Sequence, residues 1–219
     1  KTCKGNGFSK RLQKLPARLS PKLMKEGLKG LRKDVAQCIE EFYGKLNHGR
    51  FMQLCRKNLR FKKEFYDLLN SSTAYSDLLE DGTPSVVRAF CVTFHEKKRG
   101  DFHIQYDAQL FICKLIPVVA IRYGFNVMVP KEGKKYACYE LSGVSFKPYC
   151  REQQNFHERA IKYFSKEGYR MIYDAEAGEY AVGVGWFNSI VSNKKYGCVG
   201  EFLFTDFLYD WEAHEDADE

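Results

Sequence analysis

One cysteine in the last quarter of the sequence has the setting of a nucleophile. Cys198 lies in a predicted loop between two apolar segments, where its thiol is expected to be accessible. A thiolate nucleophile needs an imidazole that stabilises it and then protonates the leaving group. His103, on the polar face of a predicted strand, is the expected partner, with Asp101 or Asp107 orienting the ring. These residues predict a cysteine-dependent hydrolase, although a structural thiol or one half of a disulfide explains Cys198 equally well.

The motifs of metal and cofactor sites are incomplete. His157 begins the helical zinc motif H-E-x-x-H, but the fifth position of that motif is Ile161. Asp101, His103 and Asp107 share one face of a predicted strand and could bind a metal, but a solvated strand face produces the same pattern. No C-x-x-C pair, glycine-rich nucleotide loop or G-x-S-x-G elbow occurs. We therefore predict no metal site and no cofactor.

Basic residues are concentrated at the start of the chain. Residues 1–63 hold 18 Lys and Arg but four acidic residues, whereas the whole chain has a formal net charge of +7. Two surfaces that neutralise each other, or a basic surface that meets an anionic partner, both account for this asymmetry. On a predicted helix over 51–69, Arg56, Arg60 and Lys63 form a basic ridge that could contact phosphates. The ridge lacks interleaved aromatic residues and any recognisable base-reading module.

Hydrophobic periodicity predicts helices in the first part of the chain. Residues 1–19 are basic with little apolar periodicity and are expected to form an arm. Apolar positions three and four apart predict one helix over 20–46 and a second over 51–69. The short connection between these helices makes an antiparallel pair the expected arrangement.

From residue 85 onward the period changes to two, which predicts a sheet. Alternation indicates a hairpin of 85–94 with 102–107, and then a central strand Leu110–Ile121 that ends or bulges at Pro117. Further strands are predicted up to residue 146. Helical spacing then returns over 152–167 and stops at a glycine.

One face of a strand predicted over 180–186 carries only small side chains. Tyr180, Val182, Val184 and Trp186 line one side, whereas Ala181, Gly183 and Gly185 line the other. Close packing of a helix on the sheet explains the small residues, and so does a ligand. Trp186 is therefore a candidate binding residue.

These patterns predict an α+β protein with a basic N-terminal helical pair followed by a mainly antiparallel sheet with one inserted helix. We assign residues 1–19 to the basic arm, 20–82 to a helical segment, 83–211 to an antiparallel α+β segment that shares one core with it, and 212–219 to an acidic tail.

Composition excludes two classes of protein and leaves the compartment open. Seventeen Phe, fourteen Tyr and two Trp supply more apolar surface than a disordered chain carries. The longest mostly apolar stretch is shorter than the roughly 20 residues of a membrane-spanning helix. We expect a soluble protein. Its eight cysteines are compatible with free thiols in the cytoplasm and with disulfides in an exported chain that has lost a signal peptide.

The absence of a complete catalytic motif favours a non-catalytic macromolecule-recognition protein of the immunity, adaptor or surface-binding type, with another protein as its partner. Two alternatives stay open. The first is a cysteine-dependent hydrolase that uses Cys198 with His103. The second is a binder of nucleic acid or another anionic polymer through Arg56, Arg60 and Lys63.

Overall fold

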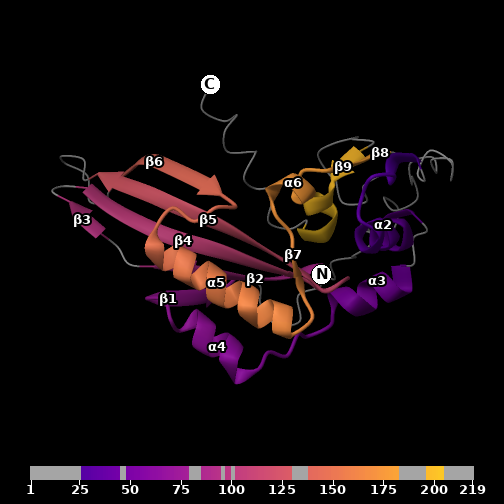
Figure 1. Ribbon diagram of the computed structural model, residues 1–219, viewed down its shortest axis with the longest axis horizontal. Helices are drawn as coiled ribbons and strands as arrows, with labels where there is room; N and C mark the ends of the chain where they lie inside the picture. Colours follow the sequence, from indigo (N-terminus) through magenta and orange to yellow (C-terminus); the bar gives the residue numbers. More distant parts are fainter. Residues whose placement is uncertain are drawn as a thin grey trace, which may run out of the picture. The chain divides into compact units, whose positions relative to one another are not determined.

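The computed structural model describes residues 26–44, 48–78, 85–94, 97–99, 102–129, 138–182 and 196–204. The predicted basic arm and acidic tail lie outside these residues. The chain divides into two compact units, and each is described by itself. The first unit includes residues 26–44 with 180–182 and 196–198, and the second includes residues 48–179 and 199–204. Figure 1 labels the elements of both.

The first unit contains a helix and a two-stranded sheet. Helix α2 (Lys33–Ile39) continues directly into a π-helical turn, η2 (Glu40–Gly44). Strand β8 (Tyr180–Val182) pairs antiparallel with β9 (Tyr196–Cys198). The apolar side of α2 and η2 is buried, as its spacing predicts, and it consists of Val35, Cys38, Ile39, Phe42 and Tyr43.

The helix predicted over 20–46 is interrupted in the part that the structure describes. Gly30 has a φ of 100°, and the helical hydrogen bonds of α2 begin only after Arg32. Glycine adopts positive φ at little steric cost and loses more entropy than other residues in a helix. The prediction of one continuous helix is therefore wrong here.

The helix predicted over 51–69 is also two helices, α3 (His48–Cys55) and α4 (Lys63–Leu69), joined by a segment over 57–62 that is neither helix nor strand and whose last residue, Lys62, has an extended backbone. Basic residues three and four apart repel one another on a helix, which disfavours helical structure across this segment. In this segment Leu59 and Phe61, two residues apart, both pack against the core. The predicted ridge of three basic residues on one helix is therefore wrong.

The second unit is built around an antiparallel sheet. Its neighbouring strands are, in order, β1 (Ala74–Asp77), β2 (Val87–Thr93), β4 (Phe102–Cys113), β5 (Val118–Val129) and β6 (Cys138–Ser145). Two short strands extend it: β3 (Lys97–Arg99) pairs antiparallel with β4, and β7 (Arg170–Met171) pairs parallel with β5. The predicted α+β class with a mainly antiparallel sheet is confirmed.

The predicted strand Leu110–Ile121 is divided between the two longest strands. Its first residues end β4 and its last residues begin β5, so that Ile112 pairs with Val119 across the hairpin. Pro117 ends the connecting turn, as its missing N–H group favours.

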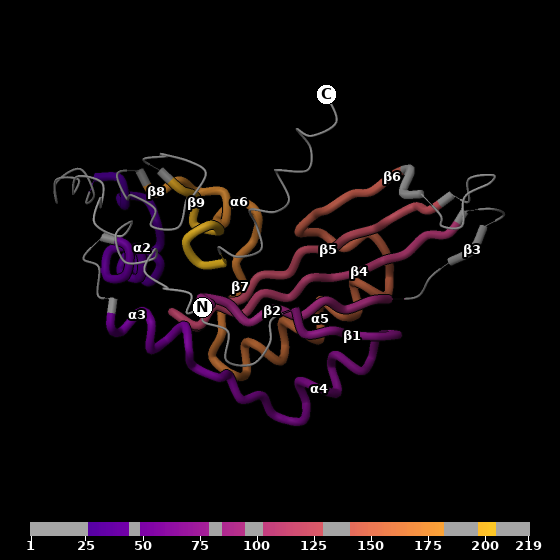
Figure 2. Tube along the Cα trace, turned by 180° about the vertical axis from the view of Figure 1, so that it is seen from behind, coloured from indigo at the N-terminus to yellow at the C-terminus, as the bar shows by residue number. Residues whose placement is uncertain are grey.

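Helices α4 and α5 (Arg151–Lys166) cover one face of this sheet (Figures 1 and 2). The apolar side chains of both helices and of the sheet form one core cluster, in which Phe65 contributes from α4 and Phe164 from α5. Helix α5 agrees with the helix predicted over 152–167, and Gly168 follows it with a φ of 79°.

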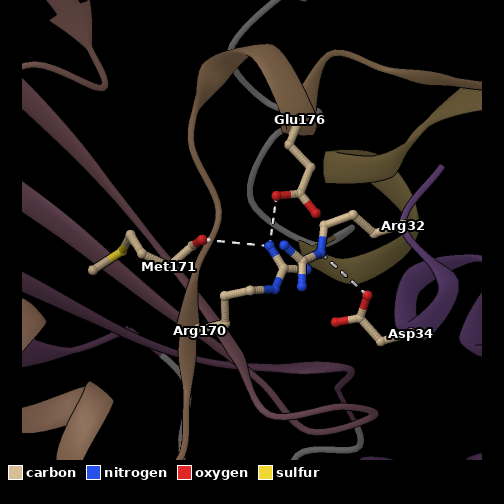
Figure 3. A network of polar contacts seen from close by, with 5 residues as sticks. All are labelled: Arg32, Asp34, Arg170, Met171 and Glu176. Atoms are coloured by element: carbon tan, nitrogen blue, oxygen red, sulfur yellow. Dashed lines mark hydrogen bonds and ion pairs between the residues drawn. The ribbon is translucent and has the colours of Figure 1, made fainter. Parts of the chain in front are cut away.

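The chain after α5 returns to the sheet. Helix α6 (Asp174–Ala177) follows β7, and Figure 3 shows the Arg170 guanidinium donating to Glu176 Oε2 at 2.5 Å and to the Met171 carbonyl at 3.5 Å. This ion pair ties α6 to β7. Arg32 and Asp34 in the same figure form an ion pair within the first unit.

A second apolar cluster lies on the other face of the sheet. Residues 199–204 are helical, and the rings of Phe204 and Phe111 lie 6.2 Å apart. Both side chains are almost fully buried. The described residues 199–204 therefore form a mostly buried helix.

Candidate functional site

The residues of the predicted catalytic group are spread over different parts of the chain. Cys198 ends β9 of the first unit and is half-buried. His103 lies near the start of β4 in the second unit and is also half-buried. Asp101 lies outside the described residues. The pairing of Cys198 with His103 therefore stays a prediction.

The second candidate for orienting His103 lies too far along the same strand. His103 and Asp107 occupy the same face of β4, but four residues of extended chain separate their Cα atoms by about 13 Å. The Asp107 carboxylate instead lies over Gly124, where an added Cβ would be 2.5 Å from Oδ1. Asn126 donates from Nδ2 to Asp107 Oδ2 at 3.3 Å.

The surroundings of Asp107 disfavour nucleophilic chemistry. Burial raises the pKa of Asp107 above its ordinary value. Burial and the negative charge of Asp107 raise the pKa of Cys91 to about 11, so this thiol is protonated at neutral pH. Across the described ranges, no group of three or more His, Cys, Asp or Glu residues is arranged to hold a metal ion.

Removing the Asp107 charge is expected to stabilise the protein at neutral pH. Burial raises the pKa of Asp107 in the folded state above the unfolded value of about 4. The stability that the protonated carboxyl contributes is therefore complete below about pH 4 and is lost as the pH rises through the folded pKa. The free energy of unfolding of Asp107→Asn should exceed that of the wild type at pH 7, and the difference should shrink toward pH 4. Urea melts at several pH values measure it, and a difference independent of pH would contradict the prediction.

His157 has a structural role that the incomplete zinc motif does not suggest. The hydroxyl of Tyr123 and Nδ1 of His157 are 2.8 Å apart, and Tyr123 is fully buried. Burial lowers the pKa of His157, which favours the neutral ring, and raises the pKa of Tyr123. A neutral imidazole accepts the hydrogen bond that a buried tyrosine hydroxyl requires.

The three predicted basic binding residues are exposed, although they do not form a helical ridge. Arg56 follows α3, Arg60 lies in the connecting segment and Lys63 begins α4. None of the three side chains makes a hydrogen bond or ion pair within the described ranges. Trp186, the remaining predicted binding residue, lies outside the described residues.

A shallow depression of about 350 Å³ lies beside the first half of α5. Glu152, Asn155, Phe156 and Arg159 line it from one side of the helix, opposite Phe94 and the hydroxyl-bearing residues 71–73. A carboxylate and a guanidinium stand two helical turns apart in this lining. The mixture of charges selects no single class of ligand.

The most distinctive surface is an apolar end of the sheet that the helices leave uncovered. Gln153, in the first turn of α5, donates from Nε2 to the carbonyls of Asp107 and Gly124. Helix α5 therefore begins level with this residue pair and runs away from the start of β4 and the end of β5 (Figure 1). We call the six apolar residues at this end the aromatic sheet end: Ile104, Tyr106, Phe125, Val127, Leu141 and Tyr149.

Strand register places the aromatic sheet end on one face. Ile104 pairs with Val127, Tyr106 with Phe125, and Val127 with Leu141, so these side chains lie on the same side as the buried Tyr123. Leu141 and Tyr149 are 59% and 42% exposed, and the other four residues are half-buried. These side chains therefore form one continuous apolar surface.

Two contacts hold the rings of this surface in place. The rings of Phe125 and Tyr149 meet edge to face with centroids 4.8 Å apart. The Phe125 ring also covers Gly143, where an added Cβ would be 2.4 Å from Cε1. A fixed aromatic surface loses little conformational entropy on binding, which favours affinity.

Sequence reasoning identified these strands but not this surface. Alternation in 102–106 and 125–129 predicts a face that is buried against something. The position of α5 decides which part of that face is covered by a helix, and the hydrogen bonds of Gln153 fix where α5 begins on the sheet. A buried glutamine in an amphipathic helix leaves no distinct pattern in the sequence.

Comparisons with protein-family models, with curated proteins and with solved structures gave no match. Among the helices that the structure describes, none has the length and apolar character to cross a membrane.

Proposed function

We propose that this chain is a non-catalytic recognition protein that binds another protein through the aromatic sheet end. The observation that carries the proposal is a continuous, single-faced apolar surface whose outer members, Leu141 and Tyr149, are exposed. Exposed contiguous apolar surface is uncommon on proteins without a partner, and interface centres are enriched in aromatic residues.

The chemistry of the other candidate groups supports recognition over catalysis. Cys91 and Cys113 are thiols whose pKa burial raises to about 11. His157 is engaged by Tyr123. The hydrolase hypothesis consequently rests on Cys198 and His103, and labelling of Cys198 by iodoacetamide well below the pH that an ordinary thiol requires would favour it.

Tyr149→Ala and Leu141→Asp are expected to abolish capture of the protein partner. Apolar and aromatic hot-spot residues contribute about 2 kcal/mol or more, so each change should weaken binding at least roughly thirtyfold. Both side chains are exposed enough that the melting temperature should change little. The measurement is quantitative capture from an extract of the source cells by immobilised wild type and variants, followed by titration of the retained protein.

The matched control is Tyr180→Ala, because Tyr180 is 62% exposed and belongs to the first unit. Equal losses in this control and in Tyr149→Ala would show that the retained protein binds exposed tyrosines indiscriminately. Retention that neither Tyr149→Ala nor Leu141→Asp reduces would contradict the proposed surface.

A further inference from the structure

The connecting segment between α3 and α4 presents a dense set of cations. Five of the eight residues from Arg56 to Lys63 are basic, and none is acidic. Leu59 and Phe61 pack against the core cluster, whereas Arg60 and Lys62, which alternate with them, are exposed. All five basic side chains are exposed.

Four of these five cations have no counterion among the described residues. The side chains of Arg56, Lys57, Arg60 and Lys63 form no ion pair or hydrogen bond within the described part of the chain, whereas Lys62 Nζ lies 2.7 Å from Glu167 Oε1. A set of like charges without partners raises the electrostatic energy of the folded chain, and an external anion lowers it.

The Lys62–Glu167 ion pair places this segment beside the end of α5. There Lys162 and Lys166 add two more exposed cations that lack partners within the described residues. Across residues 56–69 and 151–167 the chain has nine basic and five acidic residues, so the surface keeps a net positive charge. We call these six unpaired cations the basic surface: Arg56, Lys57, Arg60, Lys63, Lys162 and Lys166.

An aromatic ring lies next to the basic surface. Tyr66, on α4 one turn after Lys62 and Lys63, is 41% exposed, and its ring meets that of the buried Phe65 edge to face at 5.6 Å. Proteins that bind single strands combine cations that follow the backbone with exposed aromatic rings on which bases stack. The helical ridge expected from the sequence lacked such a ring.

We propose that the basic surface binds single-stranded nucleic acid, with the cations of residues 56–63 on consecutive phosphates and Tyr66 stacked on a base. Residues 57 to 62 span at most about 18 Å, which is enough to follow several nucleotides. This activity goes beyond the proposed protein recognition, because the two surfaces lie at opposite ends of α5.

The test is fluorescence anisotropy of a labelled oligothymidylate of about 20 nucleotides, longer than a typical single-strand site, with the full chain at several salt concentrations. The affinity should fall steeply with salt. The slope of log K against log salt concentration should be about −0.7 for each phosphate neutralised. Changing Arg56, Arg60 and Lys63 together to Gln should weaken binding at least roughly tenfold and reduce the slope by about two.

The matched control changes Lys29, Lys33 and Lys147 to Gln, which removes the same charge from exposed positions elsewhere. This control should keep most of the affinity, and both triple variants should have the melting temperature of the wild type. Tyr66→Ala should weaken oligonucleotide binding roughly tenfold but leave heparin binding unchanged, since heparin has no bases to stack.

Three results would overturn the proposal. The first is a wild type that does not bind the oligonucleotide at low salt. The second is an equal loss of affinity in the two triple variants, which would indicate nonspecific attraction to net charge. The third is tight binding of heparin together with an oligonucleotide affinity that Tyr66→Ala leaves unchanged, which would assign the basic surface to acidic polysaccharides.

Discussion

Replacing Phe65 by alanine is expected to lower the free energy of unfolding by about 3–5 kcal/mol. Phe65 is fully buried at the centre of the core cluster. Its ring stacks on Phe61 at 4.1 Å and meets Phe90 edge to face at 5.1 Å, and it also contacts rings from α5. The change removes apolar burial and leaves a cavity where α4, α5 and β2 meet.

Chemical denaturation followed by circular dichroism measures this loss, and Tyr66→Ala is the matched control. Tyr66 is the next residue of α4 but is 41% exposed, so its loss should cost below about 1 kcal/mol. If Phe65→Ala and Tyr66→Ala were equally stable, α4 would not pack on the sheet as described.

Replacing Gln153 by leucine is expected to cost about 2–4 kcal/mol, although it puts an apolar residue of similar size into a buried position. The Gln153 amide donates from Nε2 to the carbonyl of Asp107 at 2.6 Å and to that of Gly124 at 2.8 Å. Its Oε1 accepts from the backbone N–H of Tyr149 at 2.7 Å. Leucine leaves these three polar groups, two of them part-buried and the Gly124 carbonyl buried, without the partner that Gln153 provides, and the desolvation penalty exceeds the gain from apolar burial.

Gln154→Leu is the control for this position. Gln154 is the adjacent residue of α5, but its side chain is exposed and donates to Glu158 Oε1, so its replacement should change stability by less than about 1 kcal/mol. A Gln153→Leu variant as stable as the wild type would show that the amide network is not a determinant of the fold.

The Gln153 network also has a consequence for the proposed function. It holds the start of α5 level with the Asp107–Gly124 pair, and its bond to Tyr149 holds the backbone from which an exposed ring projects. Loss of partner binding in Gln153→Leu under conditions where the variant remains folded would therefore link the position of α5 to the aromatic sheet end.

The sheet and its covering helix could be predicted from sequence because their signals are local. Alternation over 86–94 and 102–106 reflects strands with one buried face. The predicted pairing of these two segments is wrong in register, because β2 pairs with residues 107–113 of β4 and residues 102–104 pair with β3. The spacing of Phe156, Ala160 and Phe164 defines the buried side of α5, and Gly168 ends it with a positive φ.

The segment over 51–69 shows where local signals fail. Leu54, Cys55, Phe61, Phe65 and Leu68 have spacing compatible with one helix, and periodicity alone predicts it. The core selects a different solution, in which Leu59 and Phe61 reach the sheet from a segment that is not helical and the basic residues avoid one another on a helix. The helical ridge is consequently lost, and the basic surface forms with α5.

By itself, the sequence determined the α+β class, the antiparallel sheet and the limits of α5, because a repeating period reports which side of a local element is buried. Only the tertiary structure decided what covers each buried side. It placed Gln153 on two carbonyls of the sheet, left the aromatic sheet end beyond the first turn of α5, and joined Lys62 to Glu167 across 105 positions of sequence. Such contacts depend on residues far apart in the chain, and no local period encodes them.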